Sequence, residues 1–409
     1  MSIVISDLAP KLSSSLKQNQ KFASMIVGRT TRSFTTQADV FSPNGLSQIN
    51  IKIPSVGFID PTTLYFTGVL QFTQGLRLTK SLNSLFSRYT IRTQSGDVIA
   101  DVNGFNVLSS ALGDLSLTAV EAESAFAITQ LTGSDQYREQ ICTGVRFAFQ
   151  LNTAIFRVEN LLPLHLLGGL DVTLYLEDTK SAFIKVDQSL TASTYQISNF
   201  NVVCDVCTVA AAVEQLYETA YNADKLSWNL TTFQHYPFQS NSIVDSFRIE
   251  TVNNSNRCLI CIPRLVSRLL DPNVDSFERT AQSLRYVQFS IGSNLLKRYE
   301  ASGGGAELFM QAQKALDFSN TGQVNAYNFH NDMPNLTAAQ QAVRSSKFIL
   351  VQDLELSKWD SSILSGSSKM PITMTLEYGS GIAPTQYDCF ILSDLQVVCG
   401  ATIGTRVLV

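Results

Sequence analysis

The sequence has little charge and few of the residues that usually build reactive sites. Charged residues make up only 16% of the 409 residues, against roughly 25% in an average domain. The three histidines, His165, His235 and His330, lie far apart in the sequence. There is no phosphate-binding glycine loop, no nucleophile elbow and no zinc-protease motif. We therefore expect no catalytic residue, no cofactor and no metal site, and we predict that the chain is not an enzyme.

Long apolar runs are missing as well. Apolar residues make up 44% of the chain, yet no stretch approaches the roughly 18 to 20 consecutive apolar residues that a membrane-spanning helix needs. The first residues, MSIVISDLAPKLSS, lack the basic region and apolar stretch of a secretory signal, so we expect synthesis in the cytosol. The low charge suits a surface that is covered by other copies of the chain, because charge usually keeps free monomers apart. An extracellular or fibre-like β protein is the alternative.

Seven cysteines include two pairs with the spacing of zinc half-sites, Cys204 with Cys207 and Cys258 with Cys261. Each pair lies in a stretch that we interpret as a β-strand, where residues three apart point to opposite faces. Neither CDVC nor CLIC contains the glycine, proline or basic residue usual in a metal-binding turn. We expect these cysteines to be reduced residues of the core.

Most of the chain after residue 33 has the pattern of β-strands. The stretch SQINIKIPS places Ile49, Ile51 and Ile53 on one face, which is typical of a half-buried strand. Residues 62–73 are rich in β-branched and aromatic side chains, and Gly96 marks a short hairpin turn. The first half contains seven or eight such strands without the alternating helices of a parallel fold. We therefore predict an antiparallel sandwich or barrel.

Three strand patterns occur twice, about two hundred residues apart. Arg88-Tyr89 recurs as Arg285-Tyr286, DVTLYLE (171–177) matches PITMTLE (371–377), and the VVC that ends at Cys204 recurs at Cys399. The three matches keep their order and have offsets of 197, 200 and 195 residues. Such a repeat indicates duplication, so we predict two similar β domains in tandem.

The predicted domains are 34–208 and 227–409. Residues 209–226, between them, contain no glycine or proline and place Val213, Leu216 and Tyr217 at helical spacing, which predicts a linking helix. A second helix is predicted in a loop, over 117–128.

Residues 1–33 form a basic arm on an acidic body. Five cations stand in this segment against Asp7 alone, whereas the rest of the chain is net negative. Such an arm suits contact with phosphate, an anionic lipid surface or an acidic neighbour, although an ordinary solvated tail has the same composition. The candidate contact residues are Lys11, Lys17, Lys21, Arg29 and Arg32.

This organisation resembles the double jelly-roll major capsid proteins of the lineage that includes adenovirus hexon, tectivirus-like phages, virophages, giant viruses and polinton-like viruses. Residues 49–72 (INIKIPSVGFIDPTTLYFTGVLQF) resemble the first two strands of such a roll. Residues 158–177 resemble the approach to a late strand, and 195–209 with the following helix resemble the end of the first roll. The resemblance implies an all-β fold of two tandem eight-stranded antiparallel jelly rolls, with short helices in loops and a linking helix.

The resemblance also implies a function. In that family, three copies form a capsomer whose six upright rolls give a pseudo-hexagonal outline that tiles an icosahedral shell. We therefore expect a major capsid protein of a DNA virus, assembled inside the host cell and located in the virion. Its expected partners are its own copies, vertex and minor capsid proteins, and genome or an internal membrane through the arm. The alternatives are a minor capsid or vertex protein, which usually has one roll, and a receptor- or glycan-binding β-sandwich protein of a virion.

Overall fold

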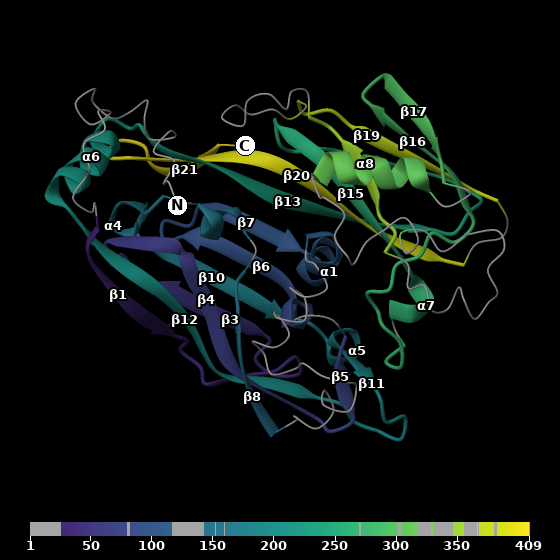
Figure 1. Cartoon of the computed structure of the whole chain (residues 1–409), viewed down its shortest axis with the longest axis horizontal. Coiled ribbons are helices and arrows are strands. Elements are labelled where there is room, and N and C mark those ends of the chain that lie inside the picture. Colours follow the sequence, from purple (N-terminus) through teal and green to yellow (C-terminus); the bar gives the residue numbers. More distant parts are fainter. Residues whose placement is uncertain are drawn as a thin grey trace.

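The chain forms two β-sandwiches that follow one another in the sequence (Figure 1). This computed structural model describes the following residues: 26–79, 82–116, 143–151, 153–158, 160–269, 271–301, 305–316, 329, 347–355, 366, 368–379 and 383–408. None of the helices in these ranges is long and apolar enough to cross a membrane. The predicted helix over 117–128 lies outside the described residues.

The first sandwich, called the first roll, runs from β1 to β12. Its strands are β1 (Ile26–Thr35), β2 (Val40–Phe41), β3 (Gln48–Ile53), β4 (Phe58–Phe72), β5 (Leu76–Leu78), β6 (Phe86–Thr93), β7 (Val98–Asn103), β8 (Thr143–Phe149), β9 (Leu162–Pro163), β10 (Leu170–Leu176), β11 (Phe183–Lys185) and β12 (Tyr195–Val209). Its helices are η3 (Leu82–Leu85), α1 (Phe105–Ser116), η4 (Ala154–Arg157), α4 (Leu164–Leu167) and α5 (Thr179–Ala182).

The second sandwich, called the second roll, follows the linking helix α6 (Ala211–Asn222). Its strands are β13 (Leu226–Ser240), β14 (Val244–Ile249), β15 (Asn256–Leu265), β16 (Leu284–Ile291), β17 (Asn294–Glu300), β18 (Leu350–Asp353), β19 (Ile372–Tyr378), β20 (Thr385–Gly400) and β21 (Gly404–Leu408). Its helices are α7 (Val266–Leu269) and α8 (Ala306–Leu316).

Both rolls have the same strand order. Eight principal strands of the first roll form the sheets β1-β12-β4-β8 and β3-β10-β6-β7, and those of the second form β13-β20-β15-β18 and β14-β19-β16-β17. Numbered along the chain within each roll, both pairs of sheets have the orders 1-8-3-6 and 2-7-4-5. All of these pairings are antiparallel. Two sheets of four strands with long crossings between them make an eight-stranded jelly roll, so the predicted fold class is confirmed.

The internal repeat in the sequence falls on equivalent strands. Arg88-Tyr89 lies in β6 and Arg285-Tyr286 in β16, the fourth principal strand of each roll. The second matched pair lies in β10 and β19, the seventh strands, and Cys204 and Cys399 lie in β12 and β20, the eighth. The duplication predicted from three short matches is therefore present in the topology.

The core of each roll lies between its two sheets. Ile49, Ile51 and Ile53 of β3 are all buried, and the residues between them are exposed, as the alternating pattern predicted. The 15-residue strand β4 alternates in the same way over most of its length. Burial of these apolar faces stabilises each sandwich, at roughly 25 cal/mol for each Å² of apolar surface removed from water.

The boundary predicted between residues 33 and 34 falls inside a strand. Residues 26–35 form β1, which pairs along its length with β12, so the first roll begins at least eight residues earlier than predicted. The reason is that β1 is an exposed edge strand, and its polar sequence IVGRTTRSFT does not alternate like a half-buried strand. The predicted linking helix over 209–226 is present as α6.

Candidate functional site: the contact between the two rolls

Helix α1 of the first roll lies between that roll and the second (Figure 1). Every side chain from Phe105 to Leu115 is buried or half-buried. Phe105, Leu108 and Leu112 line a small gap together with Phe233 of β13. A helix of the first roll therefore packs by its apolar side chains against the first strand of the second roll.

The turn before α1 fits against the second roll only as a glycine. Gly104 has a φ of 63°, and a Cβ at this position would lie 3.1 Å from Cε1 of His235 and 3.2 Å from Cζ of Phe390. The rings of His235 and Phe390 stack with their centroids 4.6 Å apart. Because glycine has no Cβ, the backbone can approach this stacked pair and take a left-handed conformation.

A cluster of three charges joins the rolls beside this contact. Asp114 near the end of α1 accepts a hydrogen bond of 2.5 Å from Nη2 of Arg279 in the second roll, and a second one from Nζ of Lys347. The side chain of Arg279 is only 3% exposed. Burial lowers the pKa of Arg279, and the charges of Asp114 and Asp275 oppose that effect. Removing Asp114 would leave a buried cation without its main partner.

A second buried carboxylate, that of Asp388, holds side chains on the face of the second roll that α1 covers. Asp388 of β20 accepts hydrogen bonds from Nε and Nη2 of Arg264, at 3.0 and 2.8 Å, and lies 3.0 Å from Nε2 of His235. Burial by itself would raise the pKa of Asp388, but Arg264 and His235 outweigh this effect and hold it at about 2. The aspartate therefore fixes the imidazole that packs against Gly104.

Several shorter contacts complete the joint between the rolls. The amide of Lys185 donates to the carbonyl of Pro272 at 2.7 Å, and the hydroxyl of Ser276 donates to the carbonyl of Ser181 at 3.0 Å. These bonds and the buried cluster at Asp114 connect the rolls at several separate points. The two rolls are thus held in one arrangement and present themselves as a single unit.

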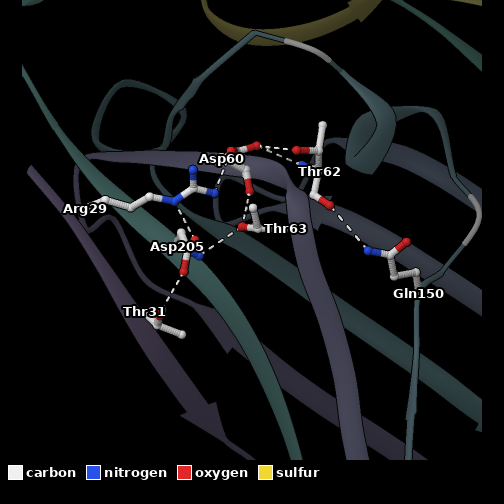
Figure 2. A network of polar contacts seen from close by, with 7 residues as sticks. All are labelled: Arg29, Thr31, Asp60, Thr62, Thr63, Gln150 and Asp205. Carbon is white, nitrogen blue, oxygen red and sulfur yellow. Dashed lines mark hydrogen bonds and ion pairs between the residues drawn. The ribbon is translucent and has the colours of Figure 1, made fainter. Parts of the chain in front are cut away.

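Two of the five predicted arm residues lie in β1. Arg29 donates from Nε to Oδ2 of Asp205 at 2.5 Å and from Nη2 to Oδ2 of Asp60 at 3.0 Å (Figure 2). Thr31 donates to the other oxygen of Asp205 at 2.7 Å. The hydrogen bond from Thr31 lowers the pKa of Asp205; burial opposes this, and Arg29 adds to the lowering. The guanidinium of Arg29 thus fastens the edge strand β1 to β12 and β4.

The network around Arg29 is built on an irregularity in β4. Between Asp60 and Tyr65 this strand has extra residues relative to β12, and Thr62 donates its amide and hydroxyl to Oδ1 of Asp60 (Figure 2). The amide of Asp205 donates in turn to the hydroxyl of Thr63 at 3.0 Å. The sequence DPTT (60–63) forms this bulge within the strand.

The other arm residues are not brought together by the structure. Arg32 also lies in β1 and is exposed, opposite Cys204 in the register. Lys11, Lys17 and Lys21 lie outside the described residues.

The described cysteines are buried and unpaired with one another in disulfides. In the β1–β12 register Cys204 pairs with Arg32 and Cys207 with Arg29, an odd separation that places the two thiols on opposite faces. Burial raises the pKa of Cys204 to about 12. Within the described ranges no group of three His, Cys, Asp or Glu residues could hold a metal ion.

Sequence reasoning missed the residues that join the rolls. Asp114, Arg279 and His235 are single residues in unremarkable surroundings, and no motif marks them. One available signal was the sequence GFNVLSSALGDL, whose apolar residues recur at helical spacing after a glycine. It indicates α1, which begins well before the predicted loop helix.

No protein-family profile matches the sequence, and no curated protein matches it. Solved structures do. PBCV-1 VP54, in a crystal structure fitted into a reconstruction of the virophage Sputnik, is 10% identical, with 95% of this chain and 99% of that chain covered and a TM-score of 0.63. The Faustovirus major capsid protein is 8% identical, with 97% and 94% covered and a TM-score of 0.62.

The mavirus major capsid protein is 9% identical, with 97% of this chain and 93% of that chain covered and a TM-score of 0.57. These neighbours are double jelly-roll capsid proteins. This chain has the double jelly-roll fold. The likeness extends over both rolls, because nearly the whole of each chain is covered. In the double jelly roll of this chain, the joint formed by α1 sets how one roll stands beside the other.

Proposed function

We propose that this chain is the major capsid protein of a DNA virus and that three copies form a capsomer with a pseudo-hexagonal outline. The observation that carries the proposal is the pair of rolls with identical strand order, joined by buried contacts into one unit. Three such units in a closed ring present six similar lobes, and head-to-tail contacts in a ring close instead of propagating.

Two further observations support this role. The Faustovirus and mavirus structures are those of major capsid proteins, and each is covered over more than nine-tenths of its length. The low charge of the sequence suits a surface buried between copies. The proposed role is structural and not catalytic, and its place is the capsid of a virion assembled inside the host cell. No specific observation favours a glycan-binding protein, and two complete rolls argue against a one-roll vertex protein.

The oligomeric state tests the proposal first. We expect the purified chain to have three times its mass of 45.0 kDa by light scattering, and negative-stain images to show six lobes in a ring. A monomer at all protein concentrations would contradict it. A trimer that binds glycans and never forms ordered arrays would support the receptor-binding alternative.

The partners proposed for the arm are anionic. Lys11, Lys17, Lys21 and Arg32 are the cations offered to genome or to an internal membrane, and vertex and minor capsid proteins are the other proposed partners. Arg29 is left out of this set, because two carboxylates of the same chain already bind it.

The arm is tested by removing residues 2–25, which leaves the paired strand β1 intact. We expect the truncated chain to remain folded but to lose binding to duplex DNA or to vesicles containing anionic lipid. Loss of DNA binding alone points to genome, and loss of vesicle binding alone points to a membrane. The proposed role of the arm is contradicted if the truncated chain binds DNA and vesicles as tightly as the full chain and still assembles shells.

A further inference from the structure

Two cysteines that the sequence places together, Cys258 and Cys261, are separated by the fold. They lie three residues apart on β15, so their thiols point to opposite faces of the sheet. Cys258 shares a face with Ile260, which lies opposite Phe390 and so faces the joint between the rolls. Cys261 points the other way. A partner for its thiol must therefore come from a neighbouring strand.

That partner is Cys389 of β20. Cys261 and Cys389 stand directly opposite one another in the antiparallel register of β15 and β20. Both side chains are 0% exposed, and the two thiols lie within hydrogen-bonding distance of each other. They face the core of the second roll, because Tyr387 of the same strand, two residues from Cys389, hydrogen-bonds to Tyr378 of the opposite sheet. Two reduced thiols therefore lie side by side inside this core.

The backbone holds the pair where a disulfide can form without movement of either strand. Directly opposed residues of antiparallel strands have Cα atoms about 4.5 or 5.5 Å apart, and disulfides span Cα separations of about 4.4–6.8 Å. The register runs without a break from Cys258 to Leu265. Beside the pair, Arg264 of β15 also donates two hydrogen bonds to Asp388 of β20. The two strands are thus fixed at the spacing that a disulfide needs.

The pairing is specific among the described cysteines. Of these six residues, only Cys261 and Cys389 stand opposite one another in a strand register. Cys399, on the same strand as Cys389, lies 3.3 Å from the carbonyl oxygen of Leu166 instead. A disulfide between β15 and β20 therefore has one candidate pair of sulfurs in the described chain.

We propose that Cys261 and Cys389 form a redox-sensitive lock, which is open as two thiols in a reducing environment and closed as a disulfide after oxidation. Disulfides are rare in the cytosol and persist outside the cell. The inference goes beyond the proposed capsid role, which supplies only the passage from one environment to the other. The closed lock joins the third and eighth principal strands of the second roll by a covalent bond.

A hydroperoxide is small enough to suit a buried pair as the oxidant. One thiolate attacks the O–O bond of hydrogen peroxide and becomes a sulfenic acid, and the departing hydroxide takes up the thiol proton as water. The second thiol then attacks the sulfenic sulfur, the S–S bond forms, and a second water leaves. Two thiols are oxidised and one peroxide is reduced to two waters. Burial raises the pKa of Cys389, and Cys261 adds to this effect, so the reaction should be slow near neutral pH.

The lock acts on the strand that carries the joint between the rolls. In the sheet, β20 lies between β13 and β15, and Asp388 and Phe390 flank Cys389 on this strand. The disulfide would close a loop of roughly 130 residues, and closing a long loop removes much of the freedom of the unfolded chain. We therefore expect oxidation to raise the melting temperature by about 5 °C or more.

Peptide mapping of the oxidised chain tests the pairing directly. Cys142, which lies outside the described residues, is replaced by serine in every sample. The folded protein is treated with hydrogen peroxide, the excess is removed with catalase, and the chain is denatured and alkylated with N-ethylmaleimide. The oxidised chain should take up two fewer alkyl groups than the untreated chain. Digestion without reductant should give one linked pair of peptides, which contain Cys261 and Cys389 and separate on reduction.

Three alanine variants show whether the effect belongs to this pair. Cys261→Ala and Cys389→Ala should each abolish both the linked peptides and the rise in melting temperature. Cys258→Ala is the matched control, because Cys258 lies on the same strand and is only 1% exposed but points to the other face, so this variant should keep both effects. Circular dichroism shows whether each variant is folded. The peptide map of the parent chain decides the pairing even where a variant does not fold.

Several results would overturn the inference. One is linkage of Cys261 to Cys258, or of either cysteine of the pair to another copy of the chain. Another is oxidation to sulfinic acid without a linked peptide. A third is full alkylation after a treatment that does link the two cysteines in the urea-unfolded chain. None of these results changes the mass found by light scattering, so the capsomer proposal stands or falls separately.

Discussion

Asp114 and Arg279 belong to different rolls and meet through a buried hydrogen bond of 2.5 Å. They are separated by 165 residues in the sequence. Lys347 binds the other carboxylate oxygen of Asp114, so one anion holds two cations of the second roll. The contact between the rolls therefore includes a carboxylate of the first roll that is shared by two cations of the second.

We expect Asp114→Ala to destabilise the chain by about 3–5 kcal/mol, because it leaves Arg279 buried without its main partner. Urea unfolding followed by circular dichroism measures the loss. Lys297→Ala is the control: its ion pair with Glu307 is exposed, so losing it should change the free energy of unfolding only slightly. Similar losses in the two variants would show that the cluster at Asp114 contributes no more than a surface pair.

Acid should weaken the joint through Asp388. Its folded pKa of about 2 lies below the ordinary value of 3.8, so the stabilisation is present above about pH 4 and is lost as the pH falls toward 2. A shift of this size corresponds to about 2 kcal/mol. Unfolding free energies measured between pH 5 and pH 2 should fall less steeply in Asp388→Asn than in the unchanged chain. If the free energies of unfolding of the two proteins fell equally steeply with pH, this acid sensitivity would not come from Asp388.

Gly104→Ala should cost more than the same change at Gly404. The two glycines have φ values of 63° and 66°, so the backbone cost of about 1–2 kcal/mol is shared. A methyl group at Gly404 meets no atom within 4 Å, whereas at Gly104 it meets His235 and Phe390. We expect a further loss of about 1–3 kcal/mol at Gly104 from overpacking. Equal melting temperatures for the two variants would argue against a tight joint.

Arg29→Ala should loosen β1 without unfolding the roll. The change removes the cation between Asp60 and Asp205, and because Arg29 is 45% exposed we expect a cost of only about 1 kcal/mol. Hydrogen exchange of the β1 amides should become faster, since these amides lie at the edge of the sheet. Arg32→Ala on the same strand should leave the exchange unchanged. Faster exchange in both variants would assign the effect to the strand and not to the network.

Apolar–polar alternation and composition predict those strands and helices that bury one face against the core of their own roll. Ile49, Ile51 and Ile53 face a core, so the apolar residues of this strand recur at every second position, as the buried positions do. The edge strand β1 is exposed over most of its length, and its sequence therefore shows no alternation of apolar and polar residues. The position of the domain boundary was missed for this reason.

The residues at the joint could not be found by spacing. Asp114 and Arg279 become partners only when both rolls have folded, and no periodic pattern links positions so far apart. Gly104 reads as a turn residue, and the need for glycine comes from His235 and Phe390 on the other roll.

By itself, the sequence determined that two similar β domains follow one another, because strand periodicity and an internal repeat depend only on the order of residues along the chain. Only the tertiary structure decided which surfaces the rolls share and which they leave bare. The physical reason is that burial depends on what lies across the gap: the same kind of helix is covered on both sides as α1 and on one side as α8.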